Sequence, residues 1–149
     1  MKKILFVIAI LFSGITSSYA SHAMSAEITY THLSGNDYLV TLKVYNDCAS
    51  TLTSGIQQTM TFSSVTCGAN FNNVMPLISQ NEVSQLCAQD LPLSTCSGGT
   101  QPGTLEFIYQ DTITLTPCVD WILHWDLNAR NGAITNLVNL KLLCILKTL

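Results

Sequence analysis

Residues 121–127, with the sequence WILHWDL, carry the strongest secondary-structure signal in this chain. Every second residue in them is a tryptophan or a leucine. This alternation predicts a β-strand with Trp121 and Trp125 on one face and His124 and Asp126 on the opposite face. The two tryptophans have two interpretations: an exposed platform that stacks against sugar rings, or a part of the hydrophobic core. The leucines that share their face favour the core.

The same alternation recurs in several short, threonine-rich segments that are separated by turn residues, namely 27–32, 38–45, 58–62, 105–109 and 112–116. The turn between the first two, residues 34–37 (SGND), predicts a hairpin whose inward side chains include Val40, Leu42 and Val44. No segment before residue 135 has a long helical period, and residues 87–103 are expected to form a long loop. About six strands therefore predict an all-β fold, an antiparallel immunoglobulin-like β-sandwich.

The first twenty residues have the form of a secretory signal peptide. Lys2 and Lys3 precede an unbroken apolar run at residues 4–12, and Ala20 ends a stretch of small residues that suits cleavage. Cleavage after Ala23 is the alternative. Removal of residues 1–20 leaves about 129 residues of the 149, which is room for one domain, and we place it at residues 21–136.

Six cysteines are spread along the chain without a C-x-x-C motif or paired histidines, so they predict disulfides rather than a zinc site. They are Cys48, Cys67, Cys87, Cys96, Cys118 and Cys144. Cys87 and Cys96 bracket a short segment, which predicts that these two pair locally. Three others, Cys48, Cys67 and Cys118, cannot all pair among themselves. One of them therefore stays free unless Cys144 or another chain supplies its partner.

Charge and motif content exclude several functions. Without Lys2 and Lys3 the chain has four basic and nine acidic residues, a net charge of −5 that disfavours nucleic-acid binding. His124 and Asp126 share a face and could belong to a catalytic triad or a metal site, but no nucleophile motif or second histidine accompanies them, which favours a polar surface stripe. A glycosidase acid pair from distant strands stays open as an alternative. We expect no catalytic, metal or cofactor site.

Four blocks of sequence, in the right order, resemble a family of secreted proteins from gliding-type Bacteroidota. Residues 21–30 (SHAMSAEITY) resemble its SH-x-M-x-x-E-I-T-Y opening, and residues 42–48 (LKVYNDC) its L-x-V-Y-R-D-C strand. Residues 118–121 (CVDW) and 130–137 (RNGAITNL) resemble its C-x-D-W and R-N-x-A-I-T-N-L blocks. The chain departs from the family at residues 128–129, where Asn-Ala replaces Cys-Cys.

This resemblance implies the N-terminal domain of a very large cell-surface protein. In the family, immunoglobulin-like repeats often follow, and many members end in a gliding-motility-associated sorting domain of the type 9 secretion system. The resemblance thus implies a secreted, non-enzymatic, adhesin-like domain at the outer cell surface, whose partner is an unknown protein or polysaccharide. The signal peptide would engage the inner-membrane export machinery. The alternative is a carbohydrate-binding module attached to a secreted hydrolase.

Residues 137–149 (LVNLKLLCILKTL) form an apolar tail that differs in composition from the rest of the chain. They are too few to span a bilayer. An amphipathic surface helix and a natural final strand are two interpretations of the tail. We favour a third, in which a frameshift or premature stop has replaced the true continuation, because relatives continue for hundreds of residues. A fold that lacks strands would expose an open edge and aggregate.

Overall fold

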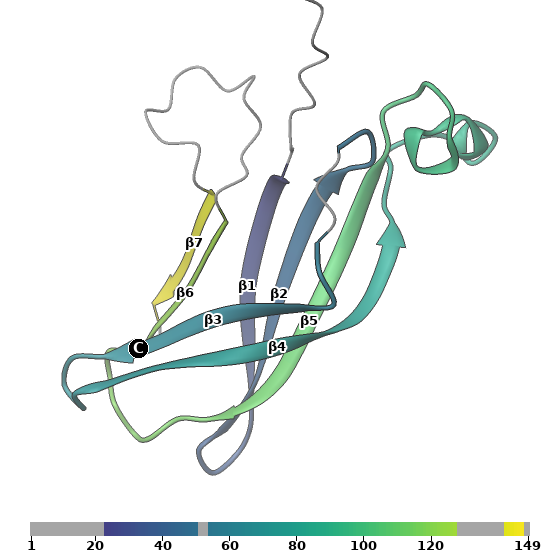
Figure 1. The fold of residues 1–149 in the computed structure, drawn as a ribbon. Helices are drawn as coiled ribbons and strands as arrows, with labels where there is room; N and C mark the ends of the chain where they lie inside the picture. Colours follow the sequence, from purple (N-terminus) through teal and green to yellow (C-terminus); the bar gives the residue numbers. More distant parts are fainter. Residues whose placement is uncertain (1–22, 51–53, 128–141, 148–149) are drawn as a thin grey trace, which may run out of the picture.

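A computed structural model of the chain describes residues 23–50, 54–127 and 142–147. These residues form seven strands and two short 3-10 helices, η1 and η2, and they contain no α-helix (Figure 1). In chain order the elements are β1 (Ala23–Ser34), β2 (Asp37–Asp47), β3 (Gln57–Ser64), β4 (Ala69–Glu82), η1 (Leu91–Leu93), η2 (Thr95–Ser97), β5 (Thr104–Thr114), β6 (Ile122–Leu127) and β7 (Leu142–Lys147). No helix in the described residues is long and apolar enough to cross a membrane.

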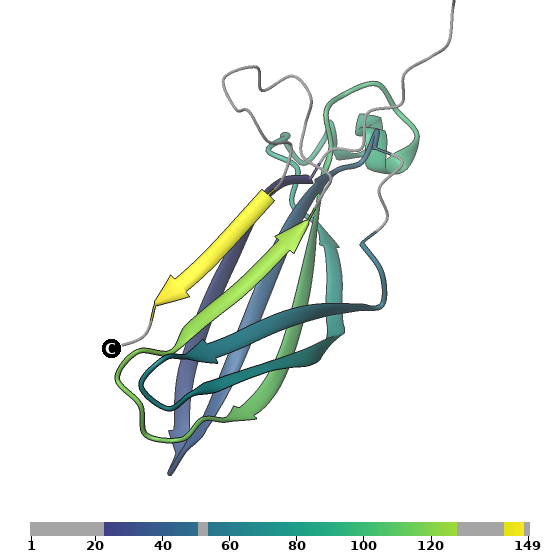
Figure 2. The ribbon, with the colours of Figure 1, turned by 60° about the vertical axis from the view of Figure 1, so that its left-hand side comes forward.

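The strands form one antiparallel sheet with the order β1-β2-β5-β4-β3-β6-β7. The sheet curls over itself, so that β3, β6 and β7 face β1, β2 and β5, and the edge strands β1 and β7 come into contact (Figure 2). The prediction of an all-β antiparallel fold is confirmed. In place of the two separate sheets expected of a sandwich, the chain has one continuous curled sheet.

Strand β4 is the place where the sheet bends. Its first part, from Ala69 to Pro76, pairs with β3, and its second part, from Leu77 to Glu82, pairs with β5. Pro76 has no N–H to donate to a sheet ladder, which makes it a natural residue at the change of partner. A register shift between Leu77 and Ser79 follows directly. One 14-residue strand therefore serves both facing halves of the sheet (Figure 1).

The core lies between the facing halves and follows the predicted alternation. Val40, Leu42 and Val44 on β2 are fully buried, as are Met60 and Phe62 on β3. Phe107 and Tyr109 on β5 and Leu123 on β6 complete the alternating rows at no more than 4% exposure. Each such apolar side chain contributes about 1.5–3 kcal/mol relative to exposure. The prediction of which faces point inward is confirmed for β2, β3, β5 and β6. In the segment 27–32 of β1 the structure buries Ile28 alone, so the alternation predicted there does not give a buried face.

The predicted hairpin between the first two strands is also confirmed. Ser34 pairs with Asp37 across a two-residue turn, in which Gly35 adopts a φ of 57°, a conformation that glycine accepts without steric cost. The first strand starts at Ala23, earlier than predicted, because its backbone pairs along nearly all of β2.

Two disulfides join segments that are far apart in the sequence, Cys48 to Cys96 and Cys67 to Cys118. The predicted Cys87–Cys96 bridge is wrong, since Cys87 is a free, exposed thiol. The loop folds back on the end of β2, where the Cys48 N–H donates to the carbonyl of Gly103 at 3.0 Å, and this brings η2 with Cys96 against Cys48. Proximity in the sequence is therefore a poor guide to pairing here.

The tail contributes a strand. Residues 142–147 form β7, which pairs antiparallel with the whole of β6. This agrees with the final-strand interpretation and contradicts a surface helix over these residues. The signal peptide, the block at 130–137 and most of the tail lie outside the described residues, as does the side chain of Cys144.

Candidate functional site

His124 and Asp126 lie on one face of β6, as predicted. The His124 Nε2 and the Asp126 Oδ1 are 3.7 Å apart, and each side chain is about one-third exposed (33% and 36%). Within the described ranges, no three histidine, cysteine or acidic side chains converge where they could hold a metal ion. The two residues form a contact between partly exposed side chains on the surface of β6.

The two tryptophans are core residues. Trp121 is 4% exposed and Trp125 is 2% exposed. Their indole N–H groups donate internally, Trp121 to the carbonyl of Thr116 at 2.9 Å and Trp125 to the Oε1 of Gln58 at 3.2 Å. Sugar stacking requires an open ring face, so the interpretation of these residues as an exposed stacking platform is wrong.

Asp120 is a structural carboxylate that the sequence did not reveal. It accepts hydrogen bonds from the hydroxyls of Ser64 and Thr66 and from the N–H groups of Val65, at 2.8 Å, and Thr66, at 2.9 Å. These bonds, that from Ser64 first, lower the pKa of Asp120 to about 2 because they favour its charged form. The carboxylate fastens the β3–β4 turn beside the Cys67–Cys118 bridge.

An open groove of about 770 Å³ lies at the end of the sheet that carries the other disulfide. Its walls come from the start of β1, from β2 and β5, from the segment that follows β4, and from the end of the loop at residues 87–103. Four apolar side chains, the ring of Tyr45, three uncharged polar side chains and one acid line it: Met24, Val83, Leu86, Pro102, Tyr45, Ser25, Gln85, Thr104 and Glu106.

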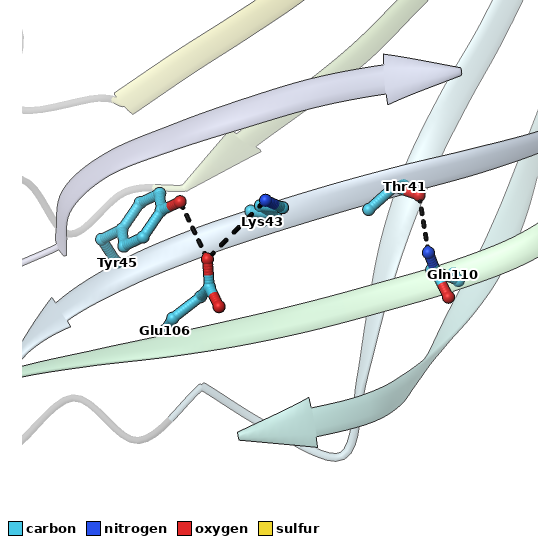
Figure 3. Close-up of polar contacts among 5 residues, drawn as sticks. All are labelled: Thr41, Lys43, Tyr45, Glu106 and Gln110. Atoms are coloured by element: carbon cyan, nitrogen blue, oxygen red, sulfur yellow. Dashed lines mark hydrogen bonds and ion pairs between the residues drawn. The ribbon is translucent and has the colours of Figure 1, made fainter. Parts of the chain in front are cut away.

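Glu106 is the one charged residue in the lining of this groove. Tyr45 donates a hydrogen bond from its hydroxyl to Glu106 Oε1 at 2.9 Å, and the Lys43 Nζ lies 3.8 Å from the same oxygen (Figure 3). The Lys43 side chain is 34% exposed and that of Glu106 only 15%. Further along the same face, Gln110 donates to the Thr41 hydroxyl at 2.9 Å, so β2 and β5 are joined by polar side chains on their outer surface (Figure 3).

The environment keeps Tyr45 protonated. Burial raises its pKa, and so do its hydrogen bond to Glu106 and the negative charges of Glu106 and Glu27. Tyr45 is consequently a fixed hydrogen-bond donor, and its ring is a wall of the groove beside a carboxylate.

A second hollow lies at the opposite end of β2. This cavity of about 110 Å³ is lined by Tyr30, Tyr38 and Trp121 and by the segment from Leu115 to Cys118. The rings of Tyr30 and Tyr38 meet edge to face with their centroids 6.0 Å apart. The cavity is small and aromatic, and it lacks the charged residue that lines the groove.

The charges of the chain are distributed unevenly around these features. Residues 23–127 contain all nine acidic residues and a single basic residue, Lys43. This part of the molecule therefore carries a formal charge of −8 and attracts cations over about one Debye length, roughly 8–10 Å in physiological salt.

Comparison of the chain with protein-family models, curated proteins and solved structures finds no significant match.

Proposed function

We propose that this chain is a non-enzymatic, extracellular binding domain of the adhesin type. The observation that carries the proposal is the pair of disulfides, which span 48 and 51 residues of an antiparallel all-β fold. Such bridges persist in oxidising compartments and are rare in the cytosol. The signal-peptide pattern of residues 1–20 supports the same location, and the groove and the aromatic cavity offer surfaces for a ligand.

Export is the first test of this proposal. Residues 1–20 fused to a reporter enzyme that is active only after disulfide formation should give activity outside the cytoplasm of a Gram-negative host. The same fusion with Leu5, Val7 and Ile8 changed to Asp should give none, because it lacks the apolar run. Equal activity of both fusions would contradict export by this segment.

The absence of catalysis is tested separately. We expect no turnover of peptide or glycan substrates by the purified chain. Hydrolysis that disappears in both His124→Ala and Asp126→Ala would overturn the non-enzymatic proposal, because those two residues are the nearest approach to a catalytic pair that the sequence suggested.

The resemblance to Bacteroidota surface proteins supports a finer proposal, in which the chain is the N-terminal domain of a gliding-motility-associated protein exported by the type 9 system. Sequencing of the DNA downstream of residue 149 tests it. We expect a reading frame that encodes immunoglobulin-like repeats and a C-terminal sorting domain. Its absence would contradict this affiliation and leave the binding-domain proposal in place.

Carbohydrate binding is the second candidate function, and the aromatic cavity is the observation that favours it. The rings of Tyr30 and Tyr38 line this cavity, and aromatic rings stack against sugar C–H groups. A polysaccharide panel should then show saturable binding that Tyr38→Ala weakens and that His124→Ala leaves unchanged. Binding that is indifferent to Tyr38 would remove this candidate.

A further inference from the structure

We propose that the groove around Glu106 binds a basic side chain, arginine or lysine, of a partner polypeptide. This inference rests on the proposed function, since it names the chemistry of the partner that the domain would bind. Three observations on the described residues carry it: the bonding of Glu106, the apolar walls of the groove, and the charge of the surrounding sheet.

The carboxylate of Glu106 can form a shorter contact with a cation than the one it makes with Lys43. It accepts one hydrogen bond, from Tyr45, and its contact with Lys43 is long at 3.8 Å, beyond the usual 2.7–2.9 Å of a charge-assisted hydrogen bond. A guanidinium or ammonium group entering the groove would form the short contact that Lys43 does not make. The low exposure of Glu106, 15%, would strengthen that contact relative to one in open solvent.

The walls suit the stem of such a side chain. Met24 and Val83 line the groove and remain 48% and 38% exposed, and Leu86 and Pro102 add further apolar surface. Lysine and arginine carry three or four methylene groups below their charge, and these pack well on apolar surface. Tyr45 also lines the groove, and aromatic rings attract cations over their faces.

The charge of the domain favours the same partner. With Lys43 as the one basic residue among residues 23–127, the field around the groove attracts cationic segments and repels anionic ones. An acidic or purely apolar peptide would gain nothing from Glu106. The chemistry of the groove thus selects a basic peptide over other occupants.

Fluorescence anisotropy of the purified, disulfide-bonded chain tests the proposal. The probe is a labelled peptide of alternating glycine and arginine, and its control is the same peptide with neutral citrulline in place of arginine. We expect saturable binding of the arginine peptide, at least about tenfold tighter than the citrulline peptide. Equal affinity for the two peptides would overturn the proposal.

Two variants distinguish the groove from the general negative field. Glu106→Gln should raise the Kd about tenfold. Asp37→Asn removes the same charge at the opposite end of β2 and should change the Kd less than about twofold. Equal weakening by both would show attraction by net charge only, and an unchanged Kd in Glu106→Gln would show that the carboxylate is not used. Either result overturns the proposal.

A third variant covers the case in which Glu106→Gln does not fold. Ser25→Arg changes an exposed residue of the groove wall and supplies a tethered guanidinium that competes with the peptide, so peptide binding should fall about tenfold. Unchanged binding in this variant would contradict the site. A failure in these assays, with export of the reporter fusion intact, counts against the groove alone, whereas peptide binding without export counts against the extracellular function alone.

Discussion

Asp120 and Glu106 lie near opposite ends of the curled sheet, and each is near a different disulfide. Their carboxylates differ in the hydrogen bonds that they accept. Asp120 accepts hydrogen bonds from two hydroxyls and two backbone N–H groups, so its hydrogen-bonding capacity is taken up by the protein itself. Glu106 accepts one hydroxyl and has a distant lysine. The number of hydrogen-bond donors around a carboxylate, rather than its residue type, therefore distinguishes the acid that holds a turn from the acid that we propose binds a ligand.

We expect the two disulfides to contribute equally to the free energy of unfolding, although the acids near them differ in their hydrogen bonds. Replacing both cysteines of either bridge by serine removes a cross-link over 48 or 51 residues and should lower the free energy of unfolding by about 4 kcal/mol in each case. Guanidinium unfolding measures the loss. Cys87→Ser, which removes a free thiol, should change the free energy by less than about 0.5 kcal/mol and serves as the control.

If Cys87→Ser proves as destabilising as the loss of a bridge, then Cys87 is bonded and the pairing of Cys48 with Cys96 is contradicted. Non-reducing peptide mapping would decide between the alternatives. A peptide that joins Cys87 to Cys96 would restore the local pairing that the sequence predicts.

The next largest loss of stability is expected at the groove end of the sheet, where Gly103 packs closely against Cys96. A Cβ added at Gly103 would lie 2.6 Å from the Cys96 Sγ and 3.1 Å from its backbone nitrogen. Gly103→Ala should therefore lower the free energy of unfolding by about 1–3 kcal/mol, measured by denaturant unfolding. Gly55→Ala is the matched control, since its Cβ would meet only one backbone oxygen at 3.7 Å. If the two substitutions lower the free energy of unfolding equally, then residue 103 is not packed against Cys96.

Acid sensitivity should distinguish the Asp120 end. The pKa of Asp120 is about 2 in the folded chain and near its ordinary value of 3.8 when unfolded. Because folding lowers this pKa, the charged carboxylate stabilises the fold at pH values above its unfolded pKa. This contribution is lost as pH falls from about 4 to about 2. Asp120→Asn should thus unfold at lower denaturant concentration than the original chain at pH 6, and the two midpoints should converge by about pH 2. A difference that stays constant with pH would contradict the charged hydrogen bonds.

Much of the strand pattern is predictable from the sequence, because each strand that packs on the core with one face alternates in polarity. The run through Val40, Leu42 and Val44 and the tryptophan run both behave in this way. Strand β4 was not predicted, since it changes partners at Pro76 and its apolar residues follow no single face. This strand runs from Ala69 to Glu82.

The two acids were not predictable because their roles depend on contacts across the fold. Tyr45 and Glu106 are 61 positions apart, and Asp120 is 54 to 56 positions from its donors. Such distances give no local signal, and the same is true of the disulfides. His124 and Asp126 show the converse, since two residues on one strand face were correctly placed together from spacing alone, although nothing in the described residues joins them into a site.

A small effect on stability is expected at Lys43, the basic residue beside Glu106. Lys43→Met removes a partly exposed ion pair with a separation of 3.8 Å, so the free energy of unfolding should change by less than about 0.5 kcal/mol. Affinity for a basic peptide should nevertheless rise about two- to threefold, because Glu106 loses the lysine that lies 3.8 Å away and the groove becomes more negative. Lysine at position 43 is therefore expected to compete with the ligand. A fall in affinity would mean that Lys43 orients Glu106 for binding instead, and Glu106 would then be held by its neighbours much as Asp120 is.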